Sequence, residues 1–346
     1  MGFKVTVHPS NHQFETKEGQ TILDAALDAG FVLPYSCRSG SCSTCKGKVL
    51  SGTFEAGPAP AQILSAEDIS DGYTLFCQAH ATSDMDIEVR EVRMASDIQI
   101  RKMPARVIAL DKLADDVMVV KLQLPATEPF RYYAGQYIEF ILKDGKRRSF
   151  SMATAPNGTE PVQLHIRHLP GGIFTDHVFG AGATQMKVRE ILRVEGPLGS
   201  FFLRDDSDKP VIFLASGTGF APIKAMMEHI IAKGITRPVT LYWGGRRPAD
   251  LYMDELARQW EKDLPFFTYV PVISDAKPED AWTGRIGFVH KAVIQDFPDL
   301  SAHQVYACGA PIVVNSARTE YTGLCGLPED EFFADSFTSE ADVIRS

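Results

Sequence analysis

The sequence lacks the long apolar runs of a membrane protein. In its 346 residues no stretch approaches the roughly 18 consecutive apolar residues of a transmembrane helix, and residues 1–10 have no apolar secretory core. Basic residues are also in deficit, since 35 Lys and Arg stand against 44 Asp and Glu, a net charge of −9. This balance argues against a nucleic-acid partner and mildly favours a partner with a basic docking patch. We expect a cytoplasmic protein with no membrane partner.

Cysteine is scarce, with six residues in the chain, and four of them are unevenly spaced. Cys37, Cys42 and Cys45 fall within nine residues, and Cys77 follows after thirty-one more. Thiols so close together converge only if the backbone loops tightly around one point, as it does around an inorganic cluster. A zinc site normally uses two short Cys pairs, and Cys77 stands alone. A disulfide needs an oxidising compartment. An iron–sulfur cluster is the favoured interpretation, and structural zinc is the main alternative.

The spacing C-x4-C-x2-C with a distant fourth cysteine resembles that of plant-type [2Fe–2S] ferredoxins. Around it lie a predicted strand at 3–8, a helix at 21–30 that Thr21 can cap, and a returning strand at 85–89. This order predicts a small α+β domain of the β-grasp kind at 1–93. The resemblance implies that Cys37, Cys42, Cys45 and Cys77 are the metal ligands.

Short alternating strands follow a predicted linker at 94–104 and indicate an antiparallel β-barrel at 105–205. We expect the strand at 147–153 to place Arg148 and Phe150 on one face, because side chains alternate along a strand. A guanidinium and an aromatic ring on one face suit a ligand with an anionic diphosphate and a flat ring system. The plainer alternative is an exposed arginine beside a core phenylalanine.

The pattern Arg-x-aromatic-Ser resembles the flavin-binding motif of the ferredoxin–NADP reductase superfamily. The resemblance implies that Arg148 holds the FAD pyrophosphate, that Phe150 packs on the flavin, and that Ser151 contacts the ring edge and takes part in catalysis. It also places Gly172 and Thr175 at the pyrophosphate, where a glycine pair opens a helix. It puts the turn that closes the barrel at 195–201. The remaining candidate FAD contacts are Ser149, His165, Arg167 and Gly171, although a lone histidine in a strand is more often structural.

Alternating strands and helices at 206–346 predict an α/β domain with a parallel sheet. A buried strand at 210–215 leads through Gly217, Thr218 and Gly219 into a helix whose first turn contains Pro222. Glycines at such a turn let a dinucleotide diphosphate approach the backbone, and the helix dipole favours its charge. The segment is therefore a candidate NAD(P) site.

The next strand, at 238–243, is followed by Arg246 and Arg247 and has no acid directly at its end. Either arginine could therefore accept the 2′-phosphate of NADPH. Relatives in which such a stretch precedes Asp-Leu-Tyr, here 250–252, mostly use NADH. We expect NADH, with NADPH as the less favoured cofactor and Arg246 as a cofactor contact.

Two further motifs of the superfamily lie near the end of the chain. A cysteine and glycine beside the nicotinamide correspond to Cys308 and Gly309, and an acid-x-aromatic pair that covers the flavin corresponds to Asp335 and Phe337. The resemblance implies catalytic roles for Cys308, Asp335 and Phe337. A buried thiol and core aromatics are the structural alternatives.

The domain order resembles the reductase components of multicomponent oxygenases, and also the reductase of a CDP-deoxysugar dehydrase. It implies an oxidoreductase in which NADH gives a hydride to FAD, and a [2Fe–2S] cluster passes single electrons to a partner oxygenase or other electron-accepting protein. Delivery to a CDP-deoxysugar dehydrase is the first alternative. A flavin reductase with a zinc-stapled docking domain is an alternative of another class.

Overall fold

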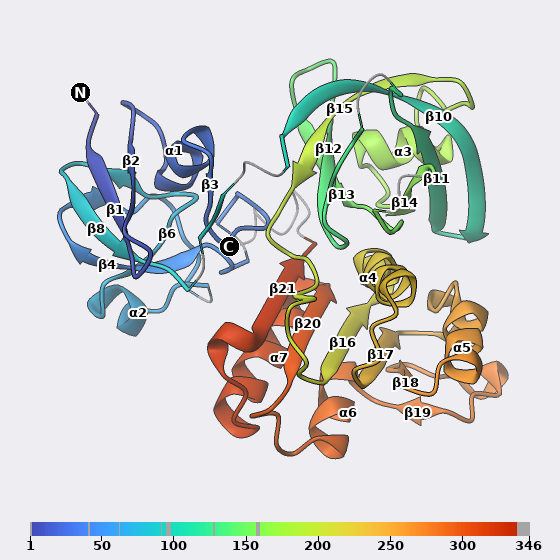
Figure 1. The fold of residues 1–346 in the computed structure, drawn as a ribbon. Helices are drawn as coiled ribbons and strands as arrows, with labels where there is room; N and C mark the ends of the chain where they lie inside the picture. Colours follow the sequence, from blue (N-terminus) through green and yellow to red (C-terminus); the bar gives the residue numbers. More distant parts are fainter. Residues whose placement is uncertain are drawn as a thin grey trace. The chain divides into compact units, whose positions relative to one another are not determined.

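The computed structural model describes residues 2–40, 42–61, 63–90, 92–94, 98–126, 129–156 and 160–337 (Figure 1). Two compact units divide the chain. The first comprises residues 1–99 with 199–201 and 334–346, and the second comprises 100–198 and 202–333. No helix in the described ranges is long and apolar enough to cross a membrane.

The first unit contains a five-stranded sheet of order β2-β1-β8-β4-β6. Its central strands β1 and β8 are parallel, and the other pairs are antiparallel. The strands are β1 (Lys4–His8), β2 (His12–Glu15), β4 (Lys46–Ser51), β6 (Tyr73–Leu75) and β8 (Met85–Glu88). Two small ribbons join β3 (Phe31–Val32) to β9 (Arg93–Met94) and β5 (Phe54–Glu55) to β7 (His80–Ala81).

The helices of this unit begin at side-chain caps. Helix α1 (Ile22–Asp28) begins where the Thr21 hydroxyl accepts a hydrogen bond from the Asp24 N–H at 3.1 Å, as the sequence predicts. Helix α2 (Ala66–Ser70) begins at a reciprocal pair of hydrogen bonds between Ser65 and Asp68. The mixed sheet with one packed helix is the predicted α+β arrangement.

The middle of the chain, predicted as an antiparallel β-barrel, forms a six-stranded antiparallel sheet of order β13-β12-β15-β10-β11-β14, which confirms the predicted all-β class. Helix α3 (Ile173–Phe179) packs Phe174 and Val178 into its core. The strands are β10 (Arg101–Ala114), β11 (Val117–Gln123), β12 (Tyr137–Ile141), β13 (Arg147–Ser151), β14 (Val162–Arg167) and β15 (Ile191–Leu198).

Two predicted boundaries of this sheet are wrong. Strand β10 begins at Arg101, four residues earlier than expected, because residues 101–106 pair with β15. The turn expected at 195–201 begins only at Gly199, since residues 195–198 are still paired within β15. Both differences arise from pairing between segments tens of residues apart, which local patterns do not record. The predicted domain boundaries stay predictions.

The parallel sheet predicted for the last part of the chain is also confirmed, with order β19-β18-β17-β16-β20-β21. Its strands are β16 (Val211–Ser216), β17 (Val239–Gly245), β18 (Phe267–Ile273), β19 (Arg285–Ile286), β20 (Gln304–Gly309) and β21 (Phe332–Ser336). Its helices are α4 (Phe220–Lys233), α5 (Asp254–Asp263), α6 (Val289–Asp296) and α7 (Pro311–Leu324). Short 3-10 turns are η2 (Gly217–Gly219), η3 (Pro248–Asp250), η4 (Pro278–Asp280) and η5 (Glu329–Glu331).

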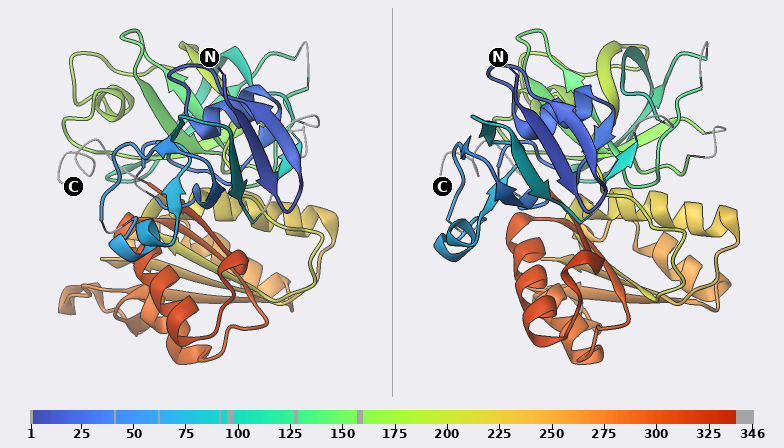
Figure 2. Two further views of the ribbon diagram at one scale, coloured as in Figure 1. Left: turned by 90° about the vertical axis from the view of Figure 1, so that its left-hand side faces the viewer. Right: turned by 60° about the vertical axis from the view of Figure 1, so that its left-hand side comes forward.

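Strand β16 is the point where the order of this sheet reverses. It lies between β17 and β20, so the chain leaves it first in one direction and returns later on the other side. Helices α6 and α7 lie side by side, joined by the Tyr321 hydroxyl and the His290 carbonyl at 3.0 Å (Figure 2). Right-handed crossovers place α4 on the opposite face. Ligands of such sheets bind where the order reverses, at the carboxyl ends of the strands.

Candidate functional site

The four predicted metal ligands lie in two pairs within the first unit. The sulfur atoms of Cys45 and Cys77 are 3.2 Å apart, and Cys42 shares a hydrogen bond with the Cys37 thiol. Cys42, Cys45 and Cys77 are buried and Cys37 is half-buried. Among the described residues, no three Cys, His, Asp or Glu side chains gather in a way that holds one metal ion. Two thiols for each of two irons is the division that a four-cysteine, two-iron cluster requires.

The loop around these thiols turns its backbone N–H groups toward sulfur. The Cys37 N–H points to the Cys42 sulfur and the Ser39 N–H to the Cys37 sulfur, each at 3.4 Å. The loop bends through left-handed conformations at Arg38, Gly40 and Ser43, with φ of 56°, 79° and 56°. A non-glycine residue rarely adopts such a φ unless its surroundings enforce it. The loop is therefore shaped for close contact between backbone and sulfur.

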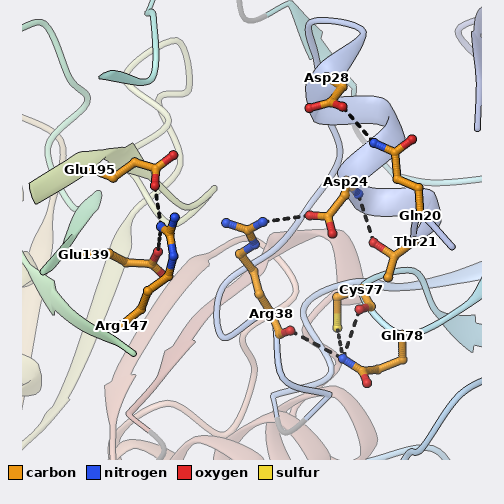
Figure 3. A network of polar contacts seen from close by, with 10 residues as sticks. All are labelled: Gln20, Thr21, Asp24, Asp28, Arg38, Cys77, Gln78, Glu139, Arg147 and Glu195. Atoms are coloured by element: carbon orange, nitrogen blue, oxygen red, sulfur yellow. Dashed lines mark hydrogen bonds and ion pairs between the residues drawn. The ribbon is translucent and has the colours of Figure 1, made fainter. Parts of the chain in front are cut away.

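Two side chains fix this loop to the rest of its unit (Figure 3). The Arg38 guanidinium forms an ion pair with Asp24 of helix α1 at 2.7 Å. The Gln78 amide donates to the Arg38 carbonyl at 3.4 Å and to the Cys77 carbonyl at 3.0 Å. The fourth cysteine is thus held beside the loop that carries the other three.

The thiol pKa values follow from the pairing and burial. The hydrogen bond with Cys77, together with burial, raises the pKa of Cys45, whereas the same hydrogen bond lowers the pKa of Cys77. The hydrogen bond with Cys37 and burial raise the pKa of Cys42. Metal ions bind the deprotonated thiolate, so a bound cation would supply the charge that burial otherwise disfavours.

Residues from distant parts of the chain also contact the cluster loop within this unit. The Ser36 hydroxyl donates a hydrogen bond to the Asp335 carboxylate, and the Thr44 hydroxyl approaches the Ala334 carbonyl at 3.4 Å. The Tyr35 N–H donates to the Ser200 hydroxyl oxygen at 2.8 Å. Sequence reasoning assigned Asp335 only to the flavin, and no local signal linked it to Ser36, which lies 299 positions away.

The second unit places Arg148 and Phe150 on one face of β13, as the alternation predicts. Their partners across the ladder are Phe140 and Ile138, which both belong to the buried core. Phe150 is half-buried, and its ring lies 5.9 Å from that of Phe140. Ser151 is buried at the end of the strand and Ser149 is exposed on the other face. A half-buried cation beside a half-buried ring fits FAD, and the predicted roles stay predictions.

The glycine turn before α3 is held by a side chain predicted to bind phosphate. The Thr175 hydroxyl donates to the Leu169 carbonyl at 2.9 Å and accepts from the Leu169 N–H at 3.2 Å. A Cβ on Gly172 would lie 2.6 Å from the Thr175 hydroxyl oxygen, so a glycine is required there. Gly171 is exposed and has a positive φ of 85°. In this structure, Thr175 shapes the turn.

The predicted dinucleotide turn meets the end of β20 at the point where the sheet order reverses. A Cβ on Gly219 would lie 2.2 Å from the Cys308 carbonyl oxygen, and one on Gly309 would lie 2.4 Å from the Ser216 carbonyl oxygen. Cys308 and Thr218 are buried here, as is Pro222 in the first turn of α4. Two loops that are far apart in sequence can approach this closely only because glycine has no side chain. The two loops therefore meet at the edge of the sheet where a dinucleotide is predicted to bind.

Two candidates from β14 lie at the same turn. A Cβ on Gly217 would lie 2.9 Å from an Arg167 guanidinium nitrogen, and Arg167 is ion-paired with Asp116 at 3.1 Å. His165 is buried, with its Nδ1 2.8 Å from the Tyr252 hydroxyl, and its Nε2 has no hydrogen-bond partner among the described residues. Burial lowers the pKa of His165 to about 3, so the imidazole is neutral. A buried, unpaired ring nitrogen beside the glycine turn is compatible with a ligand contact.

Two further candidate residues, Arg246 and Phe337, lie just after strands of the parallel sheet. Arg246 is exposed just after β17, and its N–H donates to Asp250 at 2.7 Å. Phe337 is half-buried, one residue beyond β21.

Comparison with protein families identifies three consecutive matches. Residues 5–82 match the 2Fe-2S iron-sulfur cluster binding domain, residues 104–203 the oxidoreductase FAD-binding domain, and residues 213–319 the oxidoreductase NAD-binding domain. A reductase named for CDP-6-deoxy-L-threo-D-glycero-4-hexulose-3-dehydrase, from Yersinia pestis, is 40% identical over 97% of this chain and 99% of its own. The chain belongs to this family of iron–sulfur flavin reductases.

Other members of the reductase family extend the comparison. Reductase component 1 of terephthalate 1,2-dioxygenase from Comamonas is 36% identical over 98% of both chains. The crystal structure of the Amycolatopsis reductase GcoB has a TM-score of 0.77 and 32% identity, covering 97% of this chain and 99% of that one. The predicted three-part fold, the oxidoreductase class and the [2Fe–2S], FAD and NAD cofactors are thereby confirmed.

Proposed function

We propose that this reductase takes a hydride from NADH and delivers single electrons to a separate oxygenase protein. The observation that carries the proposal is the presence of all three cofactor domains in one chain, together with the two-by-two arrangement of the thiols. When bound, FAD accepts electrons as a pair, and a [2Fe–2S] cluster passes them on one at a time.

The residues of the chain bind, orient and shield these groups. We assign Cys37, Cys42, Cys45 and Cys77 as cluster ligands, with the loop N–H groups directed at sulfur. Arg148 and Phe150 would hold the diphosphate and ring of FAD. The turn η2 and residues Cys308 and Gly309 would receive the nicotinamide dinucleotide, because they bring the carboxyl ends of β16 and β20 together where the sheet order reverses. The six cysteines form no disulfide, which supports a reducing, cytoplasmic location.

The identity of the acceptor has two candidates. Reductase components of a terephthalate dioxygenase, a phenol 2-monooxygenase and a propane 2-monooxygenase are 33–36% identical to the chain over at least 97% of it. The dehydrase reductase at 40% identity supports delivery to a deoxysugar dehydrase as the second candidate. Both acceptors use the same internal reaction, so they differ only in the protein that docks.

Spectroscopy and two artificial acceptors test the internal reaction. The purified protein is expected to contain iron, acid-labile sulfide and FAD, and to show visible absorption beyond the flavin bands. Ferricyanide can accept electrons from reduced flavin, whereas cytochrome c reports electrons that leave through the cluster. Zinc without sulfide would contradict the proposal and support the zinc-stapled alternative.

The docking partner is tested by reconstitution. An oxygenase component or a CDP-deoxysugar dehydrase, each with its substrate, is added to the reductase and NADH, and product is measured. Product from the oxygenase at a rate far above that from the dehydrase supports the first candidate. The reverse ratio supports the second.

A further inference from the structure

The segments that follow β17 and β18 run side by side at the carboxyl edge of the parallel sheet. The Ser274 N–H donates to the Gly245 carbonyl at 2.9 Å, and the Asp275 N–H donates to the Arg246 carbonyl at 3.0 Å. In a dinucleotide-binding sheet, the end of the second strand meets the adenosine ribose. These two segments therefore lie at the edge where the ribose 2′ position is expected, at which NADH has a hydroxyl and NADPH a phosphate.

One of the two arginines in this region is already bound by an acid of the same unit. The Arg247 guanidinium forms two hydrogen bonds with the Asp280 carboxylate, Nε to Oδ2 and Nη2 to Oδ1, both at 2.7 Å. Glu279 lies 3.3 Å from the same guanidinium. The Asp280 side chain is 14% exposed and that of Arg247 is 37% exposed, so the carboxylate is the more shielded member of this bidentate, charge-assisted pair. The hydrogen bond from Arg247 lowers the pKa of Asp280, which therefore stays ionised at neutral pH.

Apart from the exposed Arg246, the charged side chains around this position are acids or are paired with acids, which favours a hydroxyl over a phosphate. The Lys277 ammonium is paired with Asp275 at 2.6 Å, and the Asp250 carboxylate accepts the N–H groups of Arg246 and Arg247. A 2′-phosphate would bring about two further negative charges toward these carboxylates. A 2′-hydroxyl can instead donate a hydrogen bond to a carboxylate.

We propose that Asp280 is a specificity-determining residue, which withholds Arg247 from a 2′-phosphate and so makes the reductase select NADH. The inference rests on the proposed function only in requiring a nicotinamide dinucleotide at this edge. It assigns the preference to a residue 33 positions beyond Arg247, on the turn η4.

Equilibrium binding provides a test that does not depend on turnover. Calorimetry on the full-length holoprotein compares 5′-AMP with 2′,5′-ADP (adenosine 2′,5′-bisphosphate), which differ only in the 2′-phosphate. The wild type should bind 5′-AMP more tightly. Asp280→Asn should strengthen 2′,5′-ADP binding about tenfold, because the released guanidinium can form a charge-assisted hydrogen bond. Binding of 5′-AMP should change by less than about threefold. The ratio of kcat/KM for NADPH and NADH should shift in the same direction.

Three further variants keep the test specific. If the melting temperature shows that Asp280→Asn folds poorly, Asp280→Ser replaces it and should give the same gain in 2′,5′-ADP binding. The double variant Arg247→Ala with Asp280→Asn should lose the gain. Asp296→Asn removes a comparable bidentate partner, that of Arg285 in the same domain, and should leave the nucleotide ratio unchanged.

Several results would overturn the inference. They are tighter wild-type binding of 2′,5′-ADP, an unchanged ratio in folded Asp280 variants, or a gain that persists without Arg247. In each case the protein would still oxidise NADH or NADPH. Failure of the proposed function looks different, because neither nucleotide would bind and neither dinucleotide would be oxidised.

Discussion

The cluster loop and the dinucleotide site are built in different ways. The loop carries three of the four cluster cysteines within nine consecutive residues. Its turns come from the backbone conformations of Arg38, Gly40 and Ser43. The proposed dinucleotide site joins the turn after β16, the end of β20 and side chains from β14, which are separate in sequence. A substitution in a site encoded by one segment should disable that site and leave the other site working. A site assembled from several segments should lose activity when any one of those segments is changed.

The largest effect is expected from removing Cys77, the cluster cysteine that lies outside the loop. Cys77→Ser should abolish the cluster absorption and the acid-labile sulfide, because one iron would lose a ligand. Reduction of ferricyanide by NADH should stay close to the wild-type rate, since separate cores fold independently. Cys325→Ser, at a buried cysteine outside the loop, is the control and should retain the cluster. A collapse of ferricyanide reduction in Cys77→Ser would show that the two sites are not independent.

The converse experiment targets the closest backbone approach in the dinucleotide site. In Gly219→Ala the new methyl group would lie 2.2 Å from the Cys308 carbonyl oxygen unless the loops separate. A displacement of about 1 Å can cost about 100-fold in rate, so kcat/KM for NADH should fall by that order, with sulfide content unchanged. Gly323→Ala is the matched control, because nothing lies within 4 Å of its added Cβ. Equal kinetics for both variants would contradict the proposed dinucleotide site.

We expect acid to lower the free energy of unfolding of the second unit, because His165 is buried in its neutral form. Its pKa is about 3 in the folded protein against an ordinary value of 6.5, so below about pH 6.5 the unfolded chain binds a proton that the folded chain does not. The free energy of unfolding is therefore unaffected by His165 above that pH. Below it, the free energy of unfolding falls by up to about 1.4 kcal/mol per pH unit as the pH drops.

The measurement is denaturant unfolding of wild type and His165→Gln between pH 7 and pH 5. The variant should show a shallower loss of unfolding free energy with acid. His168→Gln, at a half-buried histidine that pairs with Asp176, serves as the comparison. Parallel curves for wild type and His165→Gln would mean that His165 is not held neutral.

The smallest effect is expected from the hydrogen bond that joins the cluster loop to Asp335, a residue far away in the sequence. Ser36→Ala removes the hydrogen bond to the Asp335 carboxylate and should loosen the loop against residues 334–336. Cytochrome c reduction should fall about threefold, a loss of less than one charge-assisted hydrogen bond, while ferricyanide reduction is unchanged. Ser51→Ala, which removes a serine–aspartate hydrogen bond on β4, should change neither rate. Equal loss with both acceptors would place the effect outside the cluster loop.

Local patterns predicted much of the fold because their causes are local. Thr21 caps α1 as expected, and Arg148 and Phe150 share a face because side chains alternate along a strand. The start of β10 was placed four residues late, since those residues are strand only by virtue of pairing with β15. The bond between Ser36 and Asp335 and the pairing of Arg247 with Asp280 left no local signal either.

The amino-acid sequence by itself determined which cofactors this reductase can hold, because ligand spacing, glycine turns and strand alternation depend on neighbouring residues. Only the tertiary structure decided how the thiols divide into pairs and which of the two arginines pairs with Asp280. It also decided where the two glycine loops touch. Those outcomes depend on distances between segments tens to hundreds of residues apart, which are set when the strands pair and the side chains pack.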